Sequence, residues 1–244
     1  MERTMKAVLF DLGHTLIDYY NDWKQPEERA VGRVSRLVAK TSPEGPDDKA
    51  VADCIFELLE EGRRTKLREM VEIPLEETLA RCFKRFSCDG VERLMSESLE
   101  AFYGVLLEDR RLVAGAPEML ASVHAMGRRI GLVSDVAWGL PSRFPLQDMR
   151  FYGLDRHFDD MVFSTDVGLR KPNPEIFRIA LRHVGARPEE TVFVGNNLQA
   201  DIKGALDVGM SAVLKKSSYY AHDDGIVPSA KISSWDELIG LLER

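Results

Sequence analysis

A single carboxylate stands at the end of the first apolar run of this chain. Residues 6–10 read Lys-Ala-Val-Leu-Phe and lead directly into Asp11, after which the chain enters a turn that contains Gly13. A short apolar run of this kind favours a buried strand of a parallel sheet, with Asp11 at its carboxyl end. Open α/β sheets bind their ligands at that edge. The segment therefore predicts a ligand site that includes Asp11.

Three more polar side chains lie at or just beyond the ends of predicted strands. Ser134 ends the run Gly-Leu-Val-Ser, Lys171 lies within Gly-Leu-Arg-Lys-Pro-Asn-Pro, and Asp201 closes Val-Phe-Val-Gly-Asn-Asn-Leu-Gln-Ala-Asp. Because parallel strands end at one edge of a sheet, we expect these residues to converge on Asp11. Taken singly, the two aspartates have an alternative role as helix caps, and Ser134 and Lys171 as loop residues.

In this order the four segments resemble the motifs of the haloacid dehalogenase superfamily. The first is similar to D-x-D-G-T-L and the last to G-D-x-x-x-x-D, while Lys-Pro-Asn-Pro-Glu-Ile-Phe at residues 171–177 is among the best-preserved segments. The resemblance covers essentially the whole predicted core. It implies an α/β fold with a doubly wound, mainly parallel sheet, an all-helical cap domain and hydrolase activity.

The resemblance implies phosphoryl transfer from a small phosphorylated metabolite. Asp11 would attack the phosphoryl group and form an aspartyl-phosphate, which divides one difficult displacement into two easier steps. Lys171 would neutralise charge on the phosphoryl oxygens, and the Ser134 hydroxyl would hydrogen-bond one of them. His14, Thr15 and Asp135 complete the predicted phosphate-binding set, together with Ser134 and Lys171.

The resemblance also implies Mg²⁺ as the cofactor. The predicted ligands are the Asp11 and Asp201 carboxylates, the Gly13 carbonyl oxygen and the Asn196 side chain, because Mg²⁺ prefers oxygen donors. The metal would relieve the repulsion between an attacking carboxylate and an anionic phosphoryl group.

Two of these positions depart from the family pattern. Gly13 replaces the second aspartate of the first motif, which serves the family as the general acid/base, and such a group contributes roughly 10²–10⁴ in rate. Asn196 replaces the first aspartate of the last motif, so one negative charge is missing near the metal. His14 replaces the family glycine and could transfer protons, since histidine titrates near neutral pH. The alternative for His14 is packing away from the site.

The elements that must position these residues fall into two groups. Between about residues 19 and 111 the pattern is helical throughout, with helices predicted at 27–40, 49–70, 75–86 and 91–107. After residue 112 strands alternate with helices: strands at 129–134, 161–164, 191–195 and 211–214, and helices at 116–126, 174–184, 201–208 and from the capping pattern at Ser234 to the C-terminus. We expect a core of residues 1–18 and 112–244 and a helical cap of residues 19–111.

Composition narrows the function classes further. The net charge of −7 over 244 residues gives no sign of binding to nucleic acid, and no apolar run approaches the roughly 18 residues that span a bilayer. The first five residues show no secretory signal, and three scattered cysteines predict reduced thiols in a cytoplasmic protein. The oligomeric state is not predictable.

Three functions are therefore open. The first is a Mg²⁺-dependent phosphatase acting on a small phosphomonoester, and the second is a binding or regulatory protein with weak or no turnover. The third is a metal-independent 2-haloacid dehalogenase, although those relatives carry a bulky residue at the position of Gly13. The aromatic side chains Tyr19, Tyr20, Trp23 and Trp138 are candidates for the substrate pocket or, alternatively, for packing between domains.

Overall fold

The computed structural model describes residues 5–41, 45–217, 219 and 225–243. The strands are β1 (Ala7–Phe10), β2 (Ile17–Asp18), β3 (Arg111–Leu112), β4 (Arg129–Ser134), β5 (Asp160–Phe163), β6 (Thr191–Gly195), β7 (Ser211–Lys215) and β8 (Ala230–Ile232). The helices are α1 (Lys24–Ala39), α2 (Asp48–Glu69), α3 (Leu75–Arg85), α4 (Val91–Leu106), α5 (Ala116–Ala125), α6 (Arg143–Phe151), α7 (Ser164–Val167), α8 (Pro174–Val184), α9 (Gly204–Asp207) and α10 (Trp235–Leu242). Short 3-10 turns lie at Ala137–Gly139, Asp155–His157 and Pro188–Glu190, and a π-helical segment at Leu198–Lys203.

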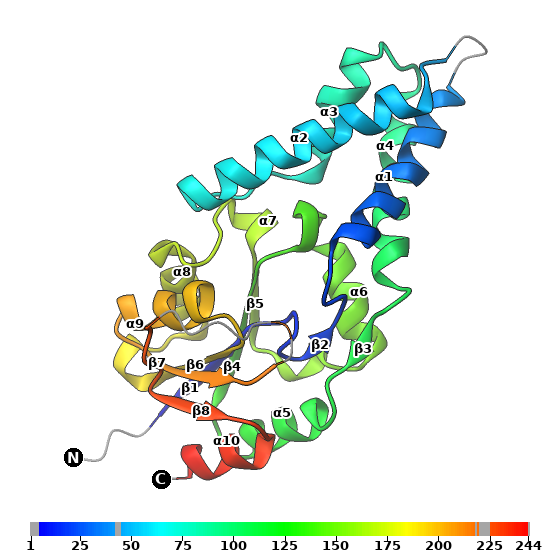
Figure 1. Cartoon of the computed structure of the whole chain (residues 1–244). Helices are drawn as coiled ribbons and strands as arrows, with labels where there is room; N and C mark the ends of the chain where they lie inside the picture. Colours follow the sequence, from blue (N-terminus) through cyan, green and yellow to red (C-terminus); the bar gives the residue numbers. More distant parts are fainter. Residues whose placement is uncertain (1–4, 42–44, 218, 220–224, 244) are drawn as a thin grey trace.

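Six strands of the described chain form one parallel sheet in the order β5-β4-β1-β6-β7-β8, with helices on both faces (Figure 1). Strand β1 is buried on both sides, and its residues alternate between the two layers. Ala7 and Leu9 pack with α8 and α9, whereas Val8 and Phe10 belong to the larger cluster that includes α5, α6 and α10. This two-sided burial is typical of a doubly wound sheet and confirms the predicted fold class.

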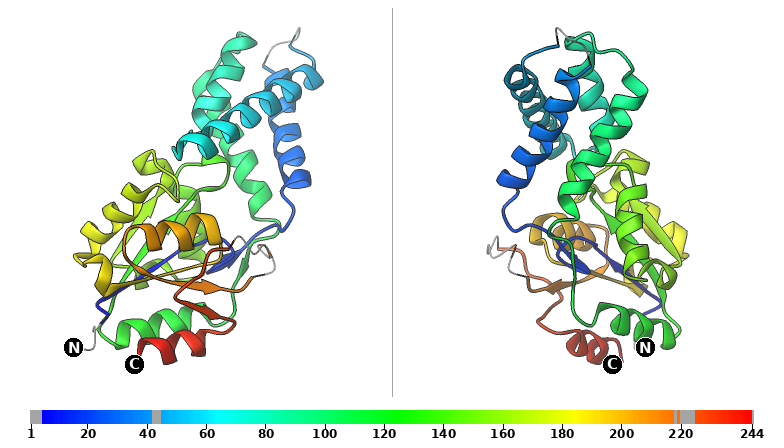
Figure 2. Two further views of the ribbon diagram at one scale, coloured as in Figure 1. Left: turned by 60° about the vertical axis from the view of Figure 1, so that its left-hand side comes forward. Right: turned by 90° about the vertical axis from the view of Figure 1, so that its right-hand side faces the viewer.

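Helices α1–α4 pack against one another and stand beyond the carboxyl ends of the strands, apart from the helices that cover the sheet (Figures 1 and 2). We call them the α1–α4 bundle. The chain enters the bundle after β2 and leaves it before β3, and these two strands pair antiparallel, with Ile17 opposite Leu112. The division into a core and a cap at residues 19 and 111 stays a prediction, consistent with this arrangement.

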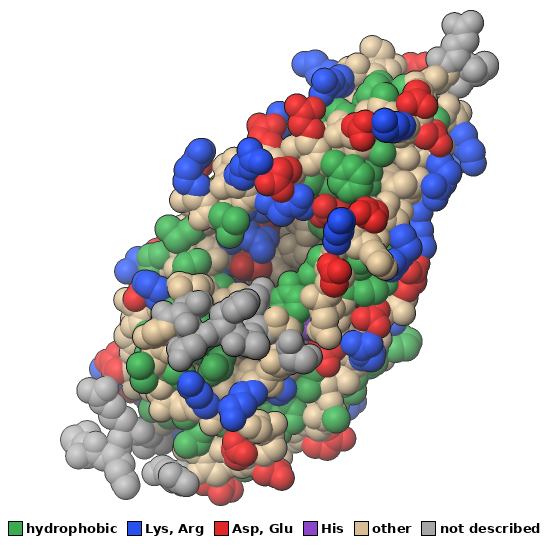
Figure 3. All heavy atoms as spheres, in the orientation of Figure 1, with side chains coloured by type: hydrophobic (Ala, Val, Ile, Leu, Met, Phe, Trp, Pro, Cys, Tyr) green, Lys and Arg blue, Asp and Glu red, His purple; other side chains and the backbone are tan. Residues whose placement is uncertain are grey.

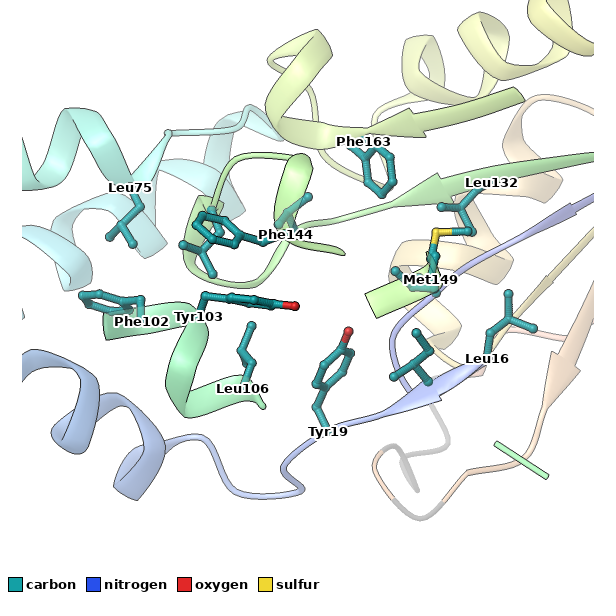
Figure 4. Packing of buried hydrophobic residues seen from close by; sticks show 14 of the residues in the cluster. Leu16, Tyr19, Leu75, Phe102, Tyr103, Leu106, Leu132, Phe144, Met149 and Phe163 are labelled. Carbon is teal, nitrogen blue, oxygen red and sulfur yellow. The ribbon is translucent and has the colours of Figure 1, made fainter. Parts of the chain in front are cut away.

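The entry to the bundle and its exit are also joined through one buried carboxylate. Asp148 of α6 accepts hydrogen bonds from the Tyr19 hydroxyl at 2.7 Å and from the Tyr103 hydroxyl at 2.7 Å, and it pairs with Arg110. Figure 4 shows the hydroxyls of Tyr19 and Tyr103 pointing into the same region. Asp148 thus links both connections between the α1–α4 bundle and the core.

Several elements differ from those expected from sequence. Strands β2, β3 and β8 were not predicted, because runs of two or three residues are too short to show a period. Helices α6 and α7 were not predicted either. The helix expected at residues 201–208 is a π-helical segment from Leu198 followed by α9. Ser234 caps α10 as predicted, its hydroxyl accepting from the Glu237 amide. Residues 1–4, part of the segment searched for a signal, and residues 42–44 of a predicted loop lie outside the described residues.

All three cysteines are free thiols in the structure. None of the helices in the described ranges is both long and apolar enough to pass through a membrane.

Candidate active site

Asp11, Lys171 and Asp201 meet at the carboxyl edge of the sheet. The Lys171 Nζ lies 2.6 Å from Asp11 Oδ1 and 2.7 Å from Asp201 Oδ1, so one ammonium contacts two carboxylates. All three residues are buried, with exposed fractions of 7% or less. The convergence of these side chains, expected from their places at strand ends, is therefore present in the structure.

Main-chain contacts of the neighbouring strands β1, β4 and β6 fix this group. The Asp11 amide donates to Val194 O at 3.0 Å, and Lys171 Nζ donates to Val133 O at 2.9 Å. Gly195 ends β6, where an added Cβ would lie 2.4 Å from Asp201 Oδ2. Glycine is therefore required at residue 195 for the close approach of Asp201.

The electrostatic environment couples the three charges. Burial raises the pKa of Asp201 to about 6, against the lowering effect of Lys171. Burial opposes the charged form of Lys171, but the carboxylates of Asp11 and Asp201 outweigh it and raise the Lys171 pKa above its ordinary value. Lys171 therefore stays a cation beside the carboxylates.

The turn after β1 contains the departures from the family motif. Gly13 has no side chain to offer, but it lines the cavity described below. The Thr15 hydroxyl is fully buried and donates to Asp11 Oδ2 at 2.9 Å, which favours orienting the carboxylate over direct contact with phosphate. His14 has a φ of +58°, in the left-handed region where the family motif has glycine.

His14 lies at the cavity wall with its imidazole buried. Its ring stacks on Tyr219, with centroids 4.0 Å apart, and its Nδ1 lies 3.7 Å from a carboxylate oxygen of Asp18. Its Nε2 has no hydrogen-bond partner within the part of the chain that the structure describes. The imidazole is thus held in place with one nitrogen available.

The remaining predicted site residues also line the cavity. The Ser134 hydroxyl is buried and makes only a long contact of 3.5 Å to Asp135 O among the described groups, so it is available to a ligand. Asp135 accepts from the Lys171 amide at 3.1 Å, and burial raises its pKa. Asn196 donates through Nδ2 to Ser217 at 3.2 Å.

Above this group lies a cavity of about 560 Å³ between the sheet and the α1–α4 bundle. Figure 3 shows the surface hollowed at this level. Its floor is formed by residues of the core, and its upper wall by residues of the bundle, among them Trp23, Leu59, Arg63, Lys66 and Met70. Of the four aromatic candidates, Tyr19, Trp23 and Trp138 line the cavity, whereas the Tyr20 hydroxyl donates to Val105 O.

Sequence reasoning missed three parts of the site. Asp201 Oδ2 accepts hydrogen bonds from the backbone amides of Asn197 and Asn196, at 3.0 and 3.1 Å. Tyr219 follows β7, so the rule that ligand sites lie beyond strand ends could have suggested it. Glu72 of the segment after α2 contacts the core, and no sequence signal marks it.

The oxygen donors present are suited to Mg²⁺. Within the described ranges, no group of three or more acidic, histidine or cysteine side chains forms a metal cluster. Mg²⁺, however, is usually bound through one or two carboxylates, with water and substrate oxygens completing the shell. Asp11 and Asp201 supply two carboxylates near one point, each in contact with Lys171, and the donor set therefore fits the ion.

The chain matches the family model of the haloacid dehalogenase-like hydrolases over residues 5–209 and belongs to that family. Both the predicted family and the prediction that the chain is an enzyme of the hydrolase class are confirmed.

Two similar curated proteins span most of the chain. Glyceraldehyde 3-phosphate phosphatase of Methanopyrus kandleri is 27% identical over 215 residues, covering 77% of this chain and 91% of that protein. Phosphoserine phosphatase of Thermus thermophilus is 28% identical over 260 aligned positions, covering 96% and 98%.

Solved structures show the same fold. A HAD phosphatase from Thermococcus onnurineus has a TM-score of 0.64 at 22% identity, covering 98% of both chains. A 2-haloacid dehalogenase from Pseudomonas syringae pv. Tomato has a TM-score of 0.72 at 23% identity, covering 98% of this chain and 99% of that one. At these identities the likeness concerns the fold alone.

Proposed function

We propose that this hydrolase is a Mg²⁺-dependent phosphatase that cleaves a small phosphomonoester through an aspartyl-phosphate at Asp11. The observation that carries the proposal is the 2.6 Å contact between the Asp11 carboxylate and the Lys171 ammonium at the floor of a cavity. A cation beside the nucleophile can receive an anionic phosphoryl group that a lone carboxylate would repel. The names of the two similar curated phosphatases support the same reaction.

In the first step, a carboxylate oxygen of Asp11 bonds to phosphorus while the bond from phosphorus to the ester oxygen breaks. The leaving oxygen takes a proton, and water then hydrolyses the aspartyl-phosphate to release phosphate and restore Asp11. Lys171 neutralises the phosphoryl oxygens, and the Ser134 hydroxyl donates to one of them. Thr15 keeps the carboxylate oriented through its 2.9 Å hydrogen bond.

Asp11, Asp201, the Gly13 carbonyl oxygen and Asn196 would hold Mg²⁺ in this proposal. When bound, the ion supplies positive charge that offsets the repulsion between the carboxylate and the phosphoryl group. Asn196 brings no negative charge, so the affinity for the ion is expected to be lower than with aspartate at this position.

The leaving oxygen needs a proton donor. Gly13 lacks the carboxylate that the family uses there. His14 is a titratable side chain at the cavity wall, and its Nε2 lacks a hydrogen-bond partner in the described part of the protein. It is therefore our candidate for this proton transfer.

The test is phosphate release from an aryl phosphate, measured with Mg²⁺ and after removal of the ion by EDTA. We expect turnover that requires Mg²⁺ and that falls by roughly 10³-fold or more in Asp11→Asn. The matched control is Asp236→Asn, which changes an exposed aspartate of α10 and leaves turnover unchanged. Wild-type turnover in Asp11→Asn contradicts the covalent mechanism. A folded wild-type protein that turns over no ester favours the binding-protein alternative.

The other expectations attached to this function remain predictions. They are a cytoplasmic location, no nucleic-acid partner, and a cap of residues 19–111 that covers the site. The net charge of −7 supports the second of them, since phosphate backbones repel acidic proteins.

A further inference from the structure

We propose that the alcohol part of the phosphomonoester is an uncharged, apolar group that carries a ring. The inference rests on the proposed phosphatase function and adds the class of substrate. The cavity of about 560 Å³ above Asp11 falls in the range of pockets that bury ligands much larger than a phosphorylated three-carbon chain. The side chains that line the cavity then determine which alcohol group fits beside the phosphoryl group.

One wall of the cavity is aromatic and is built from both parts of the molecule. Trp23 precedes α1 of the bundle, and Trp138 lies in the turn that follows β4. Their rings meet edge to face, with centroids 5.4 Å apart at 86°, and Trp138 meets Phe102 in the same manner at 5.2 Å. The Trp138 Nε1 donates to Glu27 Oε2 at 3.0 Å. These contacts hold the indole ring in one orientation.

The backbone at this wall is constrained as well. Trp138 has a φ of +54°, a conformation that side chains with a Cβ rarely adopt. Gly139 follows with a φ of +81°, and a Cβ there would lie 2.3 Å from Ile73 O of the segment after α2. Strained residues of this kind concentrate at ligand sites. The turn begins three residues after Ser134, so the strain fixes the indole close to the phosphoryl site.

The cations that line the cavity, apart from Lys171, are already neutralised. Arg63 pairs with Glu27 at 2.7 Å, and Lys66 and Arg170 pair with the buried Glu72 at 2.6 and 2.5 Å. A substrate with a second anionic group, such as the carboxylate of phosphoserine, needs an excess of positive charge at this wall. These groups have none, because Arg63 also pairs with Glu60 at 2.9 Å and Arg170 with Asp135 at 3.6 Å. Of the arginines and lysines that line the described cavity, Lys171 contacts Asp11, and each of the other three has a carboxylate partner. The wall therefore favours an uncharged group.

The apolar part of the lining supports the same choice. Leu59 and Met70 face the cavity from the bundle, and Leu140 and Pro145 face it from the core. An apolar ring placed between these side chains and the two indoles removes apolar surface from water on both sides. A short polar chain would leave the same surface in contact with water.

The experiment compares 2-phenylethyl phosphate with ethyl phosphate, and O-phosphoserine serves as the charged substrate. Both alkyl esters release a primary alkoxide, so a difference between them reports binding of the ring and not the reactivity of the leaving group. We expect kcat/KM for the phenylethyl ester to be roughly 10- to 100-fold higher, mainly through a lower KM, with phosphoserine the poorest substrate. Equal values for the phenylethyl and ethyl esters overturn the inference and leave the phosphatase function standing.

Variants of the wall test the residues. Trp138→Leu should reduce the ratio of the two kcat/KM values at least several-fold, whereas Trp138→Phe keeps most of it. Trp23→Leu provides a second test from the other side of the wall if Trp138→Leu does not fold. The matched control is Trp235→Phe, a tryptophan that bonds to Ala114 O away from the cavity and whose change leaves the ratio as it is. An unchanged ratio in both folded leucine variants contradicts the assignment.

Binding to Asp11→Asn separates the two proposals. Calorimetric titration of this variant with each alkyl ester reads affinity without turnover. Tighter binding of the phenylethyl ester supports the substrate class even if the wild-type protein hydrolyses neither ester, an outcome that would contradict the phosphatase function alone. Equal affinity for the two esters contradicts the substrate class.

Discussion

The Lys171 ammonium lies 2.6 Å from the Asp11 carboxylate, although 160 positions separate the two residues along the chain. Both side chains are almost completely buried, and the Asp11 carboxylate stabilises the charged form of Lys171. The loop that carries Lys171 is held to the α1–α4 bundle, because the Arg170 amide donates to Met70 O at 3.0 Å. The contact therefore depends on the sheet and on the seating of the bundle together.

We predict that Gly13→Asp increases turnover of an aryl phosphate, by an amount bounded by the roughly 10²–10⁴ expected of a positioned general acid/base. Among the described atoms none lies within 4 Å of the place where the new Cβ would be, and Gly13 does not have a positive φ. The substitution therefore meets neither a steric conflict nor backbone strain. The measurement is kcat over a Mg²⁺ titration.

Asn196→Asp is the companion variant, since it restores one negative charge near the proposed metal ligands. We expect the double variant to reach half-maximal activity at a lower Mg²⁺ concentration than Gly13→Asp alone. If both variants fold, bind Mg²⁺ and stay at the background rate, the site is not a modified phosphatase centre.

The site could be anticipated from the sequence because its residues occupy strand ends. Asp11 follows β1, Ser134 ends β4, and Asp201 lies in the segment beyond β6, and the parallel sheet brings these strand ends together. The positive φ of His14 and the close approach of Asp201 to Gly195 are results of three-dimensional packing, and residue types alone do not reveal them.

At residue 14 we predict that His14→Gly is more stable than His14→Ala by about 1 kcal/mol. Both variants remove the imidazole, but only glycine adopts a φ near +58° without a steric penalty. Urea unfolding of the two proteins measures the difference. Gly32→Ala in α1 is the control, where alanine should be the more stable residue, because this helical glycine has no positive φ. If the same one of the two residues, glycine or alanine, is the more stable at both positions, the strain at residue 14 is contradicted.

The buried carboxylate of Glu72 joins the bundle to the core, and we predict that Glu72→Gln lowers the free energy of unfolding by about 3 kcal/mol. Its carboxylate oxygens accept hydrogen bonds from the Ser164 hydroxyl and from Arg170 Nη1 at 2.5 Å each, and form an ion pair with Lys66 Nζ at 2.6 Å. Removing the negative charge takes from the largely buried Lys66 its carboxylate partner and from Arg170 one of its two, since Arg170 also lies 3.6 Å from Asp135. Glu60→Gln removes a solvent-accessible ion-pair partner of two arginines and should cost much less than Glu72→Gln, because water screens the pair. Equal losses in chemical denaturation contradict this role of Glu72.

We predict that the helical cap moves about residues 18–21 and 108–113, because two chain crossings between compact parts form a natural hinge. At these crossings β2 pairs with β3, and Asp148 contacts both Tyr19 and Arg110. A second set of contacts joins the segment after α2 to the core, where the Glu72 amide donates to Gly168 O and the Arg170 amide to Met70 O. We expect opening to break the second set first. Hydrogen exchange should therefore be faster at the Glu72 and Arg170 amides than at the amides of β1, and slower when inorganic phosphate is bound. Exchange as slow as in β1 at these amides indicates a rigid arrangement.

The parts of the molecule that could not be predicted are those made by contacts between distant segments. The helical pattern of residues 19–111 gave four helices close to their observed bounds, because long amphipathic stretches show a clear period. The pairing of β2 with β3 and the burial of Glu72 and Asp148 depend on how the bundle sits on the core. A charged residue in a sequence gives no sign of burial when its partners lie far along the chain.

The formation of an aspartyl-phosphate tests the central claim most directly. The wild-type enzyme is quenched in acid during turnover of an alkyl or aryl phosphate, and its peptides are measured by mass spectrometry. We predict that the peptide containing Asp11 gains the mass of one phosphoryl group, and that Asp11→Asn shows no such gain and releases no phosphate above background. A phosphoryl group on a different residue, or phosphate release by Asp11→Asn at the wild-type rate, would contradict Asp11 as the nucleophile.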